Sequence, residues 1–198
     1  PGLAGTGGGG ELTTLNLQVG ASEDDGVWVD GKSIWANNAT AESLGGSWNG
    51  GTLRNFYRFT AVSVPSSSVS SAVITLRATR NDTVTPCIVA LSAIAEDSAS
   101  APSSYSDAIS RTLTSSASSW TLGSWSSGSD YTSTDLATAI QEVIDRAGWA
   151  SGNAIVVVAS DNGSSSSATR TWKTYDGSST LAPKLAITYT AGGGGATV

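Results

Sequence analysis

Short segments in which apolar and polar residues alternate recur along most of this chain. The clearest is residues 72–79 (AVITLRAT), in which alanine, isoleucine, leucine and alanine occupy every second position. Successive side chains of a β-strand point to opposite faces of a sheet, so this spacing predicts a strand with one buried face. Several such segments are separated by turns rich in Gly, Asn, Asp and Ser. The sequence therefore predicts an all-β fold, an antiparallel, jelly-roll-like β-sandwich.

Three segments depart from this alternation. Residues 154–159 (AIVVVA) are continuously apolar, which predicts a fully buried strand. Residues 134–147 carry a single apolar stripe at helical spacing, and Asp135 suits the positive N-terminal end of a helix. We therefore expect one short amphipathic helix on the β-sandwich. Residues 41–52 are rich in Gly, Ser and Asn and are predicted to form a loop.

Glycine runs flank the alternating segments at both ends. We expect a Gly-rich N-terminal arm over residues 1–10, a single β-sandwich domain over residues 11–190 and a Gly-rich tail over residues 191–198. Glycine loses more backbone entropy on ordering than any other residue, so neighbouring chains would be needed to hold these runs. The sequence predicts that both runs are assembly elements. The glycines concerned are Gly7, Gly8, Gly9, Gly10, Gly192, Gly193, Gly194 and Gly195.

The chain contains no Met. The sequence printed therefore lacks an initiator residue, and we expect that the chain is processed, is excised from a longer polypeptide or otherwise begins internally.

The charge of the chain argues against several classes of partner. The formal net charge is −6, and the ten Lys and Arg residues are scattered. A nucleic-acid site needs clustered basic residues, so nucleic acid is not an expected partner. No apolar run approaches the roughly 20 residues that span a bilayer, so we expect no membrane insertion.

Charged residues make up 13% of the chain, about half the usual share, and Ser and Thr supply the polarity instead. Such a surface is typical of secreted, cell-surface and virion proteins.

Catalytic motifs are absent from the sequence. There is no His, which excludes Ser-His-Asp and Cys-His catalysis and His-based metal sites. We predict that the chain is not an enzyme and that it needs no organic cofactor. Four acidic residues in the N-terminal part, Glu23, Asp24, Asp25 and Asp30, could together bind Ca²⁺ through hard oxygen ligands. The alternative is a solvated acidic turn, which is more common.

Tryptophan is the other candidate binding residue. Trp28, Trp35 and Trp48 lie in the polar, loop-rich N-terminal third of the chain. They could form an exposed aromatic platform for a sugar, or they could be buried in the core or at a contact between subunits. A coplanar exposed pair would favour a sugar, and burial against another chain would favour assembly.

Three stretches resemble a known family. Residues 55–79 (NFYRFTAVSVPSSSVSSAVITLRAT), 133–158 (STDLATAIQEVIDRAGWASGNAIVVV) and 171–190 (TWKTYDGSSTLAPKLAITYT) resemble segments of DNRLRE-type β-sandwich domains. These domains are related to a class of carbohydrate-binding modules. The block GWASGNAI, with the Gly-rich tail further on, looks most like phage virion examples, in capsid decoration or fibre components.

Domains of this family occur in cell-wall proteins, polysaccharide-acting enzymes and phage virion proteins, so the non-enzymatic prediction rests on the missing catalytic motifs, and the resemblance adds the likeness to phage examples. It implies a structural subunit of an extracellular or virion-surface assembly, with copies of itself and other surface proteins as partners. The alternative that it implies is a carbohydrate-binding module of a secreted or cell-surface protein, with a glycan as ligand.

Overall fold

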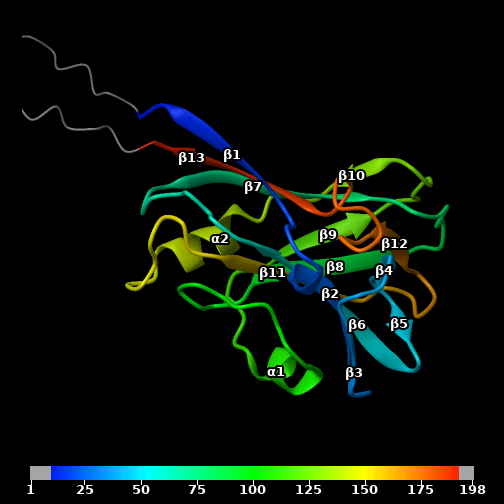
Figure 1. Ribbon diagram of the computed structural model, residues 1–198. Coiled ribbons are helices and arrows are strands. Elements are labelled where there is room, and N and C mark those ends of the chain that lie inside the picture. The colour runs from blue at the N-terminus through cyan, green and yellow to red at the C-terminus, as the bar shows by residue number, and fades with distance from the viewer. Residues whose placement is uncertain (1–9, 192–198) are drawn as a thin grey trace, which may run out of the picture.

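The computed structural model describes residues 10–191, which form a sandwich of two antiparallel β-sheets (Figure 1). Sheet A contains, in spatial order, β1 (Leu12–Gln18), β13 (Lys184–Thr190), β7 (Val69–Arg77) and β10 (Asp130–Thr132). Sheet B contains β3 (Ile34–Ala36), β2 (Asp25–Asp30), β6 (Gly51–Phe59), β11 (Ile155–Asp161), β8 (Cys87–Ala93) and β9 (Ser118–Leu122) in that order, and β5 (Ser47–Trp48) pairs with β6. A separate ladder joins β4 (Ala41–Leu44) to β12 (Arg170–Lys173). The predicted all-β sandwich is confirmed.

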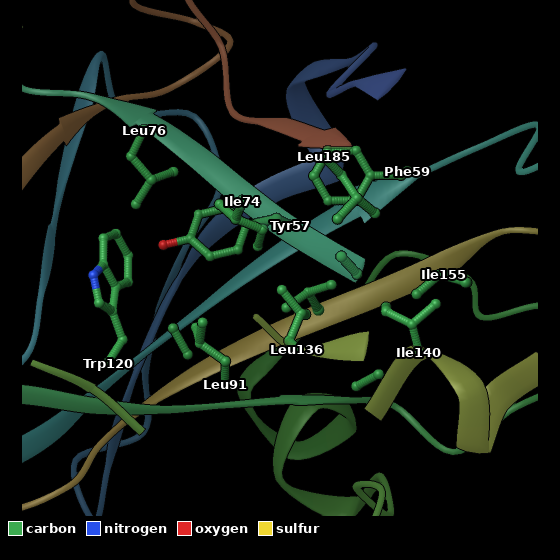
Figure 2. Close-up of a cluster of buried hydrophobic side chains, with 14 of the residues drawn as sticks. Tyr57, Phe59, Ile74, Leu76, Leu91, Trp120, Leu136, Ile140, Ile155 and Leu185 are labelled. Atoms are coloured by element: carbon green, nitrogen blue, oxygen red, sulfur yellow. The ribbon is translucent and has the colours of Figure 1, made fainter. Parts of the chain in front are cut away.

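The main core lies between the two sheets (Figure 2). Alternation in β7 turns Ile74 and Leu76 into this core, where both side chains are fully buried. Tyr57 and Phe59 of β6 enter it from sheet B, and they are also buried. The period of two that predicted a half-buried strand at residues 72–79 thus places one row of β7 side chains in the core.

Sheet B is buried on both faces, which explains the continuous apolar run of β11. Ile155 and Val157 pack in the main core, whereas Val156 and Val158 pack on the other face with Phe56 and neighbouring residues. A strand covered on both sides has no solvent-facing row, so its sequence shows no alternation. The prediction of a fully buried strand over residues 154–159 is confirmed.

One short helix closes the sandwich beside β7 and β8. This helix, α2 (Ala137–Ile144), buries the predicted apolar stripe, including Ile140 and Val143. Its first turn is held by Asp135, whose Oδ1 accepts hydrogen bonds from the backbone N–H groups of Ala137 (2.9 Å) and Ala72 (2.8 Å). Asp135 therefore joins the start of the helix to strand β7.

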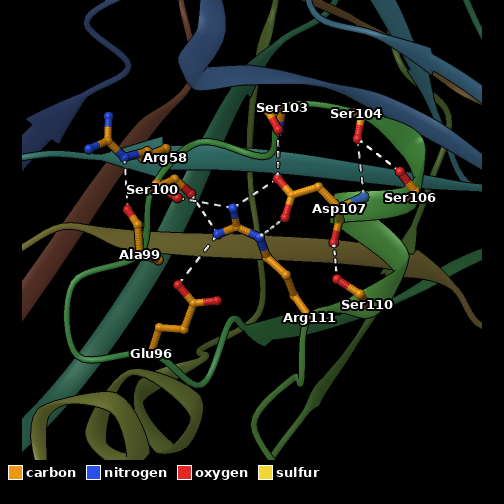
Figure 3. A network of polar contacts seen from close by, with 10 residues as sticks. All are labelled: Arg58, Glu96, Ala99, Ser100, Ser103, Ser104, Ser106, Asp107, Ser110 and Arg111. Carbon is orange, nitrogen blue, oxygen red and sulfur yellow. Dashed lines mark hydrogen bonds and ion pairs between the residues drawn. The ribbon is translucent and has the colours of Figure 1, made fainter.

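A second helix, α1 (Tyr105–Ser110), was not predicted and covers the outer face of sheet B. The Ser104 hydroxyl caps it by accepting a hydrogen bond from the Asp107 N–H group. Arg111 follows the helix and donates two hydrogen bonds to the Asp107 carboxylate, from Nε (3.0 Å) and Nη2 (2.9 Å) (Figure 3). The Arg111 guanidinium holds the pKa of Asp107 down at about 2. A one-turn 3₁₀ helix, η1 (Ser22–Asp24), precedes β2.

The first and last strands are neighbours. β1 and β13 pair along their whole length, from Leu12 opposite Thr190 to Gln18 opposite Lys184. Beyond the strands, the Ala191 N–H group donates to the Glu11 carbonyl at 2.8 Å. The two ends of the described chain therefore leave the sandwich side by side (Figure 1). Within residues 10–191, no helix has the length and apolar character needed to cross a membrane.

Candidate functional site

A groove lies at the end of sheet B next to the β5 hairpin. We call this hollow of about 560 Å³ the β5 groove. Its apolar residues come mainly from β2, β3 and β6, and its polar residues from β4, β5 and the loop before β12. The lining residues are Val27, Ile34, Trp35, Ala36, Glu42, Ser43, Ser47, Trp48, Leu53, Ser166, Ser167 and Thr169. A volume of this size suits a small ligand.

The β5 hairpin places Trp48 beside the groove. Asn49 and Gly50 both have positive φ angles, 50° and 74°, and connect β5 to β6 as a tight two-residue turn. Asn-Gly is a sequence typical of such turns. The hairpin is anchored to its surroundings because the Gly46 N–H group donates to Asp161 Oδ1 (2.8 Å) and the Ser47 N–H group donates to the Ser166 carbonyl (3.0 Å). The prediction that residues 41–52 form a loop is therefore wrong, and the Asn-Gly pair was the signal that could have corrected it.

The three candidate tryptophans do not form one exposed platform. Trp28 is buried on the outer face of sheet B, where its ring lies 6.2 Å from that of Phe56. The half-buried Trp35 lies edge-on to Phe56, with ring centroids 5.3 Å apart. Trp48 is the exposed member of the three, with 57% of its surface accessible. The β5 groove thus has one strongly exposed aromatic side chain beside it.

Glu42 gives the β5 groove its charge. It is the one ionisable residue among the twelve that line the groove, and within the described chain it takes part in no salt bridge with Lys or Arg. Burial raises the pKa of the Glu42 carboxyl to about 7. Its negative charge is therefore poorly solvated and has no compensating cation in residues 10–191.

Buried polar groups lie behind Glu42. Asp25 is opposite Tyr57 in the pairing of β2 with β6, and the Tyr57 ring packs edge-on against Trp172 at 4.9 Å. Trp172 in turn is opposite Glu42 in the pairing of β12 with β4. Four buried side-chain atoms in this region have no hydrogen-bond partner within the described residues. These atoms are Asp25 Oδ1, Asn55 Oδ1, Tyr57 Oη and Trp172 Nε1.

Asp25 is the second carboxyl with an altered pKa. Burial raises its pKa to about 7, and the hydrogen bond that Oδ2 accepts from the Tyr175 N–H group (2.9 Å) only partly offsets this. Asp25 is fully buried and does not line the β5 groove. It is therefore not placed to act with Glu42 as a pair of carboxyls on the two sides of a bound substrate.

The four carboxylates predicted to share Ca²⁺ are not brought together. Asp24 ends η1 and Asp25 begins β2, where the Asp25 carboxylate accepts a hydrogen bond from the Tyr175 N–H group. Asp24 pairs with Arg58 on the outer face (2.7 Å), and Asp30 pairs with Arg54 at the far end of the strand (2.6 Å). Glu23 is exposed. Residues 10–191 hold no group of three or more acidic, His or Cys side chains that could bind a metal ion, so the structure corrects this prediction.

Most of the predicted assembly glycines lie outside the described residues, namely Gly7, Gly8, Gly9, Gly192, Gly193, Gly194 and Gly195. Gly10 is described and lies against β13, where an added Cβ atom would stand 2.5 Å from Thr190 Cγ2 and 2.6 Å from the Ala191 carbonyl oxygen. At Gly10 the close neighbour is therefore the domain's own last strand.

Comparison of the sequence with protein-family models and with curated proteins finds no match to either. The fold and the site define an antiparallel β-sandwich domain with a groove at one end of one sheet. The resemblance to DNRLRE-type domains rests on the three short stretches described above and stays a prediction.

Proposed function

We propose that this chain is a non-enzymatic structural subunit of an extracellular or virion-surface assembly, and that two copies associate through the free edge of β1. One observation carries this proposal. β1 is a seven-residue edge strand without a single charged residue (LTTLNLQ), and no backbone hydrogen bond within residues 10–191 reaches its outer edge. Soluble monomers commonly protect such an edge with charges, proline, a bulge or a covering segment.

The other sheet edges offer less for pairing. The outer strands β3 and β10 have three residues each. Strand β9 has five, and its Ser119 carbonyl already accepts a hydrogen bond from the Thr134 hydroxyl at 3.1 Å. β1 is therefore the longest edge strand in the described chain and the one best suited to extend its sheet into a neighbour.

A second copy is the occupant that suits this edge. If two β1 strands pair antiparallel about Leu15, each Leu15 faces its own counterpart and Leu17 faces Thr13. Leu15 and Leu17 are half-buried and already pack against the main core. Such pairing would continue the apolar row of one subunit into the other and would satisfy the backbone groups of both edges.

The competing function, a carbohydrate-binding module, receives less support. A flat sugar platform would call for two exposed, coplanar aromatic rings. Trp28 is buried, Trp35 lies edge-on to Phe56, and Trp48 alone of the three is strongly exposed. The absence of His and the burial of Asp25 outside the β5 groove support the non-enzymatic part of the proposal.

Asn16→Lys tests the proposed association. Asn16 is exposed on β1, and in the paired arrangement it faces Thr14 of the other copy, so the two introduced lysines would lie close together and repel each other. We expect wild-type chains to dimerise as their concentration rises. Asn16→Lys should raise the Kd of the dimer by about tenfold or more, with little change in Tm. Light scattering coupled to gel filtration measures the mass.

Thr121→Lys is the matched control, because Thr121 is an exposed residue on the edge strand β9 of the other sheet. This variant should dimerise like the wild type. A wild type that stays monomeric at every concentration, or an Asn16→Lys variant that dimerises normally, contradicts the proposal.

A further inference from the structure

The β5 groove combines one acidic group with an apolar wall. Val27 and Leu53 belong to a small buried apolar cluster with Val29, against which Ile34 and Ala36 pack. The same residues, Val29 excepted, line the groove. A ligand in the groove would therefore bury its apolar part against these side chains and would meet a single ionisable group, Glu42.

Glu42 favours a positively charged ligand. A carboxylate that is partly removed from water and has no cationic partner is costly to keep ionised. Within the described chain neither Lys nor Arg pairs with it, and the remaining polar lining is hydroxyl groups from Ser43, Ser47 and the segment 166–169. A ligand cation would supply the missing charge, whereas an anionic ligand would be repelled.

Trp48 adds an aromatic surface of the kind that binds organic cations. Its indole is largely exposed and stands on the hairpin that borders the groove, and Trp35 also contributes to the lining. Indole is the most favourable aromatic partner for an ammonium group, and the interaction strengthens where water is excluded. A strongly hydrated metal ion would gain little from the Trp48 ring or from the apolar wall.

We propose that the β5 groove binds a small organic cation, with its ammonium group paired to the Glu42 carboxylate and its apolar part against Trp48 and the Val27–Leu53 wall. The charge of Glu42, the aromatic ring and the apolar surface each match one part of such a ligand. This site is separate from the β1 edge, so it stands or falls independently of the proposed assembly.

The test compares choline with 3,3-dimethylbutan-1-ol, a neutral molecule of nearly the same shape. Isothermal titration calorimetry on the full chain should show that the wild type prefers choline by about tenfold or more. Glu42→Gln should remove this preference while the neutral alcohol binds as before. Trp48→Ala should weaken choline binding as well. Circular dichroism confirms that each variant is folded.

Glu23→Gln is the matched control, because it removes the same charge from an exposed position that does not line the groove. This variant should keep the preference for choline. Equal binding of choline and the alcohol by the wild type overturns the proposal, and so does the absence of choline binding at millimolar concentrations. Binding of neutral sugars in the groove without any preference for choline also overturns it and would favour the carbohydrate-binding function.

Discussion

Replacing Arg170 with methionine should lower the Tm of this protein by about 10 °C or more. Arg170 is fully buried at the start of β12, yet it has no carboxylate partner in the described chain. Its guanidinium donates instead to four backbone carbonyls, and so connects β12 with the end of β9 and with the segment before β8. The acceptors are Gly123 (2.7 Å), Thr169 (2.8 Å), Val84 (2.9 Å) and Leu122 (3.0 Å).

Methionine fills much of the same volume but cannot donate a hydrogen bond. Carbonyls that lose their donor while remaining buried cost about 1–3 kcal/mol each, so we expect a loss of roughly 3–5 kcal/mol in the free energy of unfolding. Arg170→Lys should be intermediate, because one ammonium group cannot reach all four acceptors.

Arg80→Met is the control for Arg170→Met, since the Arg80 side chain is 71% exposed and its nearest carboxylate oxygen is 3.9 Å away. It should leave the Tm almost unchanged. Thermal unfolding followed by circular dichroism compares the three variants with the wild type. A Tm for Arg170→Met within a few degrees of the wild-type value would show that water replaces the guanidinium without penalty.

The second large effect concerns pH. The pKa values of Asp25 and Glu42 are raised to about 7 in the folded chain, from ordinary values near 4 in the unfolded chain. The folded state therefore holds these protons more tightly. The stability that the two carboxyls contribute is fully present below pH 4 and is lost as the pH rises through 7. We expect the protein to be more stable at pH 5 than at pH 8.

For Asp25, which is fully buried, linkage gives on the order of 2–3 kcal/mol between pH 5 and pH 8. Glu42 contributes less, because part of its side chain contacts water. Asp107 does not affect the comparison of pH 5 with pH 8. Its pKa is lowered to about 2, so the stability that it contributes is lost only as the pH falls below about 4. The Tm should fall by roughly 5–10 °C from pH 5 to pH 8.

Substitutions identify the groups responsible. Asp25→Asn should flatten much of the pH dependence and should be more stable than the wild type at pH 8, because the amide carries no charge to desolvate. Adding Glu42→Gln should flatten it further, and Glu23→Gln should leave the slope unchanged. If the wild-type Tm rises between pH 5 and pH 8, or if Asp25→Asn keeps the full wild-type slope, the buried carboxyls do not govern this dependence.

The elements that could be predicted from the sequence are those determined by residues close together in the chain. Alternation at residues 72–79 identified β7, the run AIVVVA identified β11, and the apolar stripe after Asp135 identified α2. Helix α1 was missed because it has only six residues, too few to show an apolar stripe at helical spacing. Its capping residue, Ser104, binds the Asp107 N–H group three residues further on. In a stretch with many Ser residues this capping signal is hard to distinguish.

Much less of the candidate site could be predicted from the sequence. Its lining comes from two separate parts of the chain, residues 27–53 in part and residues 166–169, and they come together only when the strands pair. Trp48 was a candidate, but nothing local to Glu42 shows that its charge is poorly solvated. The acidic residues near position 25 illustrate the opposite error. They are neighbours in sequence, yet Asp24 pairs with Arg58, Asp25 is buried where it binds the Tyr175 N–H group, and Asp30 lies about 16 Å further along β2.

The pairing of β1 with β13 also sets the order of events during synthesis. β13 lies between β1 and β7 in sheet A, so neither of those strands gains this neighbour until the chain has been synthesised as far as residue 190. Sheet B has its long strands β6, β8 and β11 earlier in the sequence. Contacts between such distant segments slow folding, because a long loop must close before they form. Until β13 arrives, sheet A lacks a central strand and covers the apolar inner face of sheet B incompletely, and we expect the nascent chain to be most prone to aggregation in this interval.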